Sequence, residues 1–109
     1  MSTAHIPIDP AKIRRESLRW YLLVTLYNAA PVGCYEELLL VTLSAIYSDT
    51  TALEIRKEVA YLESRKLVAI RKEPSGRWFA ELYHYGTDIV EYSIDCLPGI
   101  ARPVKTWGG

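Results

Sequence analysis

The stretch from Thr51 to Tyr83 constrains the fold more than any other part of the chain. Thr51 and Glu54 have the spacing of a capping box, in which a threonine hydroxyl and a glutamate close free N–H groups at a helix start. After this helix come a short β-prone run at Leu67–Ile70, turn chemistry at Glu73–Gly76 and an alternating aromatic segment up to Tyr83. The stretch therefore predicts an amphipathic helix followed directly by a β-hairpin.

The predicted helix after Thr51 has two distinct faces. Ile55, Val59 and Leu62 share one face at a rotation of about 100° per residue, and we expect them in the core. The opposite face carries Leu53, Lys57, Ala60, Tyr61 and Ser64. In a helix-turn-helix this second face is the one presented to a DNA groove.

Two helices are expected before this stretch. Asp9-Pro10 is a helix start, since a carboxylate caps free N–H groups and proline is tolerated at the first position. Apolar residues then recur at steps of three and four, and Asn28–Gly33 ends the helix. The apolar positions are Ile13, Trp20, Tyr21, Val24 and Tyr27, broadened by Leu22, Leu23 and Leu26.

The second helix is expected from residue 34 or 35 to residue 46 or 47. Glu36 and Glu37 fall in its first turn, where the helix dipole favours negative charge. The run LLLVTLSA is apolar nearly all round, so its periodicity is also compatible with a buried strand. Length and the early glutamates favour a helix.

A fourth helix is expected from about His84 to Ile94, with an extended tail rich in proline and glycine after it. We expect a flexible arm at residues 1–8, one domain at residues 9–95 and the tail at residues 96–109. The predicted fold class is mainly α (α+β). Its architecture is a winged helix-turn-helix with three helices, a two-stranded hairpin wing, a fourth helix and the extended tail.

Composition limits the possible functions. The 109 residues suffice for one core, and 13 Lys and Arg balance 13 Asp and Glu, which argues against coating nucleic acid by bulk charge. The segment from Glu54 to Arg77 is the exception, with seven basic and four acidic residues. Cys34 and Cys96 are expected to be reduced thiols. No apolar run approaches a membrane span, so we expect a soluble cytoplasmic protein with no membrane partner.

Residues 14–104 resemble a family of small uncharacterised proteins of Mu-like phages and prophages. The most specific part is Gly86 and Asp88 in the last helix, followed by Pro98-Gly99-Ile100 and Arg102-Pro103. The chain departs from the family pattern at Cys34, Lys66 and Tyr83, where asparagine, glycine and threonine are usual. The resemblance implies expression in a bacterial host cytoplasm during a phage cycle or from a resident prophage.

Nucleic acid is the first candidate partner. Helix N-termini and hydroxyls hold phosphates, and basic side chains on a wing contact the DNA backbone or a groove. A solvated charged face is the equally weighted alternative. The candidate contacts to double-stranded DNA are Thr50, Thr51, Lys57, Ser64, Arg71, Lys72 and Arg77.

Catalysis has little support in the sequence. The two histidines, His5 and His84, belong to no recognisable catalytic group, and we find no phosphate loop, HExxH or CxxC motif. We expect no enzyme activity, no cofactor and no metal.

Protein binding is the main alternative to DNA binding. The chain has three tryptophans and eight tyrosines, which are favoured at interfaces but also fill small cores, as expected for Trp20. Trp107 in the tail is the candidate anchor of a homodimer, formed by a swapped or docked tail. Two functions therefore stay open: a phage DNA-binding accessory or regulatory protein, and a module that binds other phage proteins.

Overall fold

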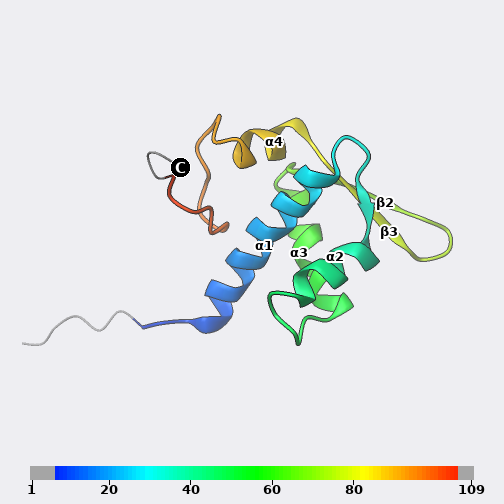
Figure 1. Cartoon of the computed structure of the whole chain (residues 1–109), viewed down its shortest axis with the longest axis horizontal. Helices are drawn as coiled ribbons and strands as arrows, with labels where there is room; N and C mark the ends of the chain where they lie inside the picture. The colour runs from blue at the N-terminus through cyan, green and yellow to red at the C-terminus, as the bar shows by residue number, and fades with distance from the viewer. Residues whose placement is uncertain (1–6, 106–109) are drawn as a thin grey trace, which may run out of the picture.

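The chain alternates helices and strands in the order α1, β1, α2, α3, β2, β3, α4 (Figure 1). The structure is a computed structural model that describes residues 7–105. Within them lie four helices and a three-stranded antiparallel sheet of order β1-β3-β2, an α+β fold. The elements are α1 (Pro10–Ala29), β1 (Cys34–Tyr35), α2 (Glu36–Ser44), α3 (Ala52–Ser64), β2 (Val68–Lys72), β3 (Trp78–Leu82) and α4 (His84–Val90).

Helix α1 begins where the sequence predicts. The Asp9 carboxylate accepts hydrogen bonds from the backbone N–H groups of Ala11 and Lys12, at 3.1 and 3.2 Å. Its buried face is narrower than predicted, because Ile13 and Tyr21 are 54% and 36% exposed. Four leucines of the helix, Leu18, Leu22, Leu23 and Leu26, are fully buried.

The predicted start of the second helix at residue 34 or 35 is wrong. Cys34 and Tyr35 form β1, opposite Ala80 and Phe79 of β3. Gly33 makes this pairing possible, since its φ of +87° suits glycine and a Cβ there would collide with the Ala80 carbonyl. The helix itself, α2, begins at Glu36, as the early glutamates indicate, but ends at Ser44, before the predicted end at residue 46 or 47.

Only half of the predicted capping box forms at α3. The Thr51 hydroxyl accepts a hydrogen bond from the backbone N–H of Glu54 at 3.1 Å. Both carboxylate oxygens of Glu54 instead accept hydrogen bonds from Arg14 of α1, at 2.8 and 2.9 Å. The glutamate thus joins two helices, a contact that local spacing does not reveal.

Strands β2 and β3 pair antiparallel from Val68 opposite Leu82 to Lys72 opposite Trp78. Two hydrogen bonds close the turn between them, from Glu73 N–H to the Arg77 carbonyl and from Gly76 N–H to the Glu73 carbonyl, at 2.9 and 2.8 Å. In Figure 1 this hairpin projects from one end of the molecule.

Helix α4 is shorter than predicted, because it ends at Val90 and Tyr92 adopts a left-handed φ of +60°. Residues 96–105, which we call the C-terminal strap, have no regular secondary structure but pack back on the helices. Ile100 is only 8% exposed, and the N–H of Ala101 donates to the Glu16 carbonyl at 3.0 Å. The strap thus belongs to the same folded unit as the helices. The first six residues of the predicted arm and Trp107 lie outside the described residues.

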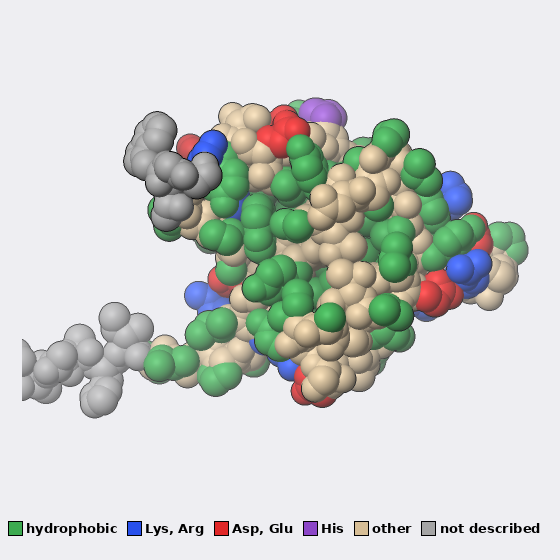
Figure 2. Space-filling model, in the orientation of Figure 1, with side chains coloured by type: hydrophobic (Ala, Val, Ile, Leu, Met, Phe, Trp, Pro, Cys, Tyr) green, Lys and Arg blue, Asp and Glu red, His purple; other side chains and the backbone are tan. Residues whose placement is uncertain are grey.

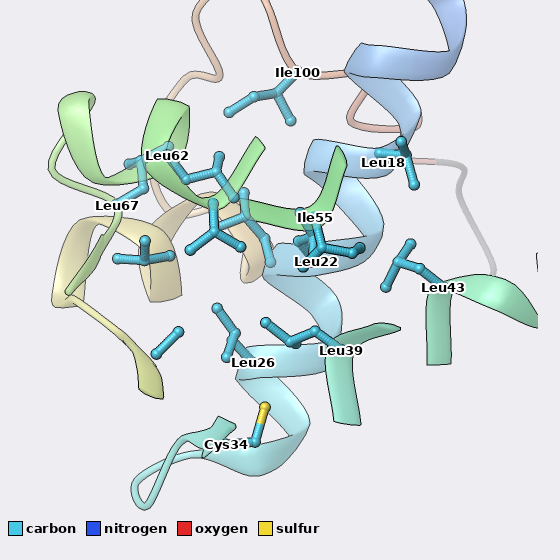
Figure 3. Packing of buried hydrophobic residues seen from close by; sticks show 14 of the residues in the cluster. Leu18, Leu22, Leu26, Cys34, Leu39, Leu43, Ile55, Leu62, Leu67 and Ile100 are labelled. Carbon is cyan, nitrogen blue, oxygen red and sulfur yellow. The ribbon is translucent and has the colours of Figure 1, made fainter. Parts of the chain in front are cut away.

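One hydrophobic core joins all of these elements (Figure 3). Leu22, Leu39 and Leu43 pack against Ile55, Val59 and Leu62, the three α3 residues predicted to face inward. Cys34 and Ile100 lie at opposite ends of this cluster in Figure 3. Helix α3 is therefore fixed on its inner side, which leaves its outer side for contacts with other molecules.

Candidate nucleic-acid interface

The outer face of α3 is open to solvent except at Tyr61, which the sequence also placed on this face but which lies under Arg19 and against Gly99 of the strap. Lys57, Ala60 and Ser64 are exposed, and Leu53 is 77% exposed. These residues lie on the side of the helix opposite Ile55, Val59 and Leu62, as the sequence predicts. The small side chain of Ala60 would allow a groove of DNA to approach the helix backbone closely.

The hydroxyl groups of the predicted site make local hydrogen bonds. Thr50 donates to the Tyr47 carbonyl and Ser64 donates to the Tyr61 carbonyl, both at 2.5 Å. The Thr51 hydroxyl caps α3, as described above. Their observed role is to shape the two ends of α3.

Lys57 lies beside a basic residue that the sequence did not single out. Lys57 and Arg15 of α1 line a shallow groove of ≈300 Å³, together with Thr51 and Leu53. Neither basic residue makes an ion pair with any other of residues 7–105. The two acidic residues of the groove, Glu54 and Glu58, accept hydrogen bonds from Arg14 and Arg19. Lys57 and Arg15 are thus two cations available to an anionic ligand.

Arg77 is held by a carboxylate. Its guanidinium donates to both oxygens of Glu37 on α2, at 3.0 and 3.2 Å, and lies 3.8 Å from the centroid of the Tyr35 ring. This hydrogen bond raises the pKa of Arg77 and lowers that of Glu37 below its ordinary value. Both side chains remain about half exposed, at 47% and 57%. The pair is therefore solvated and open to competition from a phosphate.

The other two basic residues of the hairpin lie over aromatic rings. The Arg71 guanidinium is 4.4 Å from the Phe79 ring centroid and 3.6 Å from a Glu73 oxygen. The Lys72 ammonium is 4.7 Å from the Trp78 ring centroid. Both are exposed, and cation–π contacts of this kind contribute about 0.5–1 kcal/mol at exposed sites. The rings orient both charges, but Arg71 is also paired with a carboxylate, whereas Lys72 forms no ion pair with any other of residues 7–105.

Arg56, which adds to the positive charge of this stretch, has a structural role. It donates to both oxygens of Glu36 and to the Gly76 carbonyl, each at 2.6 Å, and lies 4.8 Å from the Trp78 ring centroid. These bonds lower the pKa of Glu36, which also accepts the Trp78 N–H at 2.7 Å. Arg56 joins α3, α2 and the hairpin turn, so it is not free to contact a ligand.

The structure thus gathers the predicted residues on two neighbouring elements, α3 and the hairpin, and adds Arg15 from α1. Sequence spacing along α3 could not find Arg15, which is distant in the chain. The only signal in the sequence was that Arg14 and Arg15 are adjacent. Neighbouring residues of a helix point in different directions, so when Arg14 faces one set of carboxylates, Arg15 faces another part of the surface.

No group of three or more His, Cys, Asp and Glu side chains in residues 7–105 could hold a metal ion. The His84 ring lies beside that of the neighbouring Tyr85, with centroids 4.1 Å apart and planes tilted by 42°. None of the helices in this part of the chain has the length and apolar character needed to cross a membrane.

Comparisons with protein-family models, with curated proteins and with solved structures find no match to this chain.

Proposed function

We propose that the chain is a winged-helix protein that binds double-stranded DNA, with α3 in the major groove and the β2–β3 hairpin as the wing. The element order carries the proposal. A helix, a short strand, two helices and a hairpin whose second strand pairs with that first strand form the arrangement of a winged helix-turn-helix.

The cations available for phosphates support this function. Lys57, Arg15 and Lys72 are not neutralised by carboxylates of the described residues, and they lie on α3, beside it and on the hairpin. Thr51 holds the N-terminus of the 13-residue α3, whose free N–H groups attract a phosphate. Arg77 would exchange the exposed Glu37 for a DNA phosphate at little cost, since such surface pairs contribute about 0–1 kcal/mol. Arg71 is itself 64% exposed, and the Glu73 that it would leave keeps the hydrogen bond from the Tyr35 hydroxyl.

The resemblance of residues 14–104 to proteins of Mu-like phages supports a biological context for this DNA binding. In that context the chain is a phage or prophage accessory or regulatory protein that acts in the cytoplasm of the bacterial host. Gly86, which carries part of the resemblance, lies in α4, and Pro98-Gly99-Ile100 lie in the strap, where Gly99 is against Tyr61 of α3 and the Pro98 carbonyl accepts a hydrogen bond from Arg65.

Salt-dependent binding to a random-sequence duplex tests the DNA proposal. We expect fluorescence anisotropy to show binding at about 50 mM salt that weakens steeply toward 200 mM. The variant Lys57→Glu/Arg77→Glu should lose most of this binding, and Lys12→Glu/Lys105→Glu, with the same charge change at residues that belong to neither α3 nor the hairpin, should keep more. Equal, weak binding of wild type and the Lys57/Arg77 variant at low salt would refute the proposal.

A protein-interaction module is the second candidate, and a specific observation favours it. Arg14, Arg56, Arg71 and Arg77 all form ion pairs with glutamates, which reduces the positive potential of the proposed DNA face. Exposed apolar side chains lie elsewhere, at Leu38 and Val41 of α2. If the chain does not bind duplex DNA, this second function becomes the better one.

A further inference from the structure

Leu53 is a large aliphatic side chain on the outer face of α3. It is 77% exposed, and it is the second residue of the helix after the Thr51 cap. The same face carries Lys57, Ala60 and Ser64, which are also exposed. In helix-turn-helix proteins the N-terminal residues of the recognition helix are the ones that contact base edges. Leu53 therefore occupies a position at which a side chain would meet bases rather than phosphates.

The strap limits which part of α3 a DNA groove can reach. Gly99 of the strap lies so close to the Tyr61 hydroxyl that a Cβ at this position would collide with it. Arg65, directly after α3, donates to the Pro98 carbonyl of the strap at 3.1 Å. The strap thus covers part of the C-terminal half of α3. The N-terminal half, which includes Leu53, is the more open part and the better candidate for entry into a major groove.

Positive charge lies next to this apolar side chain. Leu53 lines the same groove as Lys57 and Arg15, and neither cation forms an ion pair with any other of residues 7–105. The two glutamates of the groove are held by arginines of α1. The groove therefore combines cations that suit phosphates with an apolar surface that does not. A DNA duplex offers a partner for both, since its backbone is anionic and its grooves display the bases.

The hairpin carries charges that suit phosphates. Figure 2 shows basic and acidic side chains next to each other at the hairpin end, on the right of the view. Arg71, Lys72 and Arg77 are its exposed basic residues. Contacts from such side chains to phosphates position a protein on the duplex but carry no sequence information directly. A preference for particular bases is therefore expected to come from α3.

We propose that Leu53 contacts the C5-methyl group of thymine in the major groove. Guanine, cytosine and adenine present hydrogen-bond donors and acceptors there, whereas thymine adds a methyl group that apolar side chains contact. Against a donor or acceptor, Leu53 would exclude water and leave the polar group unpaired, which costs free energy. Against a methyl group it buries apolar surface on both partners. This inference rests on the proposed DNA binding and names the base that the α3 face prefers.

The test compares an alternating dA–dT duplex with the same duplex containing deoxyuridine, which lacks only the C5-methyl group of thymine. In fluorescence anisotropy at one low salt concentration, the full chain should bind the thymine duplex about fourfold more tightly, the effect of one buried methyl group. Leu53→Ala should bind the two duplexes nearly equally and keep the wild-type circular dichroism spectrum, because Leu53 is largely exposed. Val41→Ala, at a 69% exposed position of α2, is the matched control and should keep the wild-type preference.

The outcomes separate this inference from the proposed function. Equal binding of the wild type to both duplexes would overturn the thymine contact and leave DNA binding itself standing. A preference for the thymine duplex that persists in Leu53→Ala would also overturn it, since another residue would then contact the methyl groups. If the wild type bound neither duplex, the DNA-binding function would fail and this inference would fail with it.

Discussion

The two ends of the molecule use the same chemistry for different purposes. At the strap end, Arg19 donates to the Glu58 carboxylate and to the Gly99 carbonyl, both at 2.8 Å, and lies over the Tyr61 ring. At the hairpin end, Arg77 donates to Glu37 and lies over the Tyr35 ring. Figure 1 shows the strap and the hairpin at opposite ends of the fold.

The two ion pairs differ in how deeply they are buried. The Arg19 and Glu58 side chains are 14% and 2% exposed, whereas Arg77 and Glu37 are 47% and 57% exposed. A buried carboxylate that loses its partner keeps a large desolvation cost, and a solvated one does not. The strap-end pair therefore holds the fold together, and the hairpin-end pair is available for exchange with a ligand.

The largest effect should come from breaking the buried pair. Arg19→Ala leaves Glu58 buried and unpaired and removes the hydrogen bond to Gly99, so we expect a loss of about 3–5 kcal/mol in the free energy of unfolding. Urea denaturation measures it. The matched change at the other end, Arg77→Ala, should cost less than about 1 kcal/mol. Equal losses would show that the two pairs do not differ as their burial indicates.

A smaller loss is expected from the strap itself. Ile100→Ala removes a side chain that is 8% exposed and packs in the core, so unfolding should become easier by about 2–4 kcal/mol. Val104→Ala, at a strap position that is 89% exposed, should change the free energy of unfolding by less than about 0.5 kcal/mol. If Ile100→Ala were as mild as Val104→Ala, the strap would not be part of the core.

Much of the fold could be predicted from the sequence because its signals are local. Asp9-Pro10 marks the start of α1, Thr51 marks the start of α3, and the spacing of Ile55, Val59 and Leu62 identifies the buried side of α3. These features depend on neighbouring residues only.

The features that sequence reasoning missed depend on contacts between distant residues. Cys34 and Tyr35 form a strand because β3, more than forty residues later, offers them a free edge. Lys66 takes a left-handed φ of +62° after α3, a conformation that glycine usually supplies at a helix end, and hydrogen bonds from the Lys66 N–H to the Glu63 carbonyl and from the Leu67 N–H to the Leu62 carbonyl hold it there.

The candidate site was predictable in its elements but not in its charges. The spacing on α3 placed Lys57 on the outer face, and the alternation of the hairpin identified its strands. The sequence could not show that Glu37 holds Arg77, or that Arg15 of α1 lies in the same groove as Lys57, because both contacts depend on how the helices pack.

Duplex binding by Glu37→Gln tests most directly whether the hairpin-end arginine is available to DNA. The change removes the competing carboxylate from Arg77, so we predict roughly fivefold tighter binding to random duplex and a salt dependence steeper by about one phosphate contact. Glu91→Gln makes the same change in net charge outside α3 and the hairpin and should have a smaller effect. Unchanged or weaker binding by Glu37→Gln, or an equal gain from Glu91→Gln, would contradict a role for Arg77 in DNA binding.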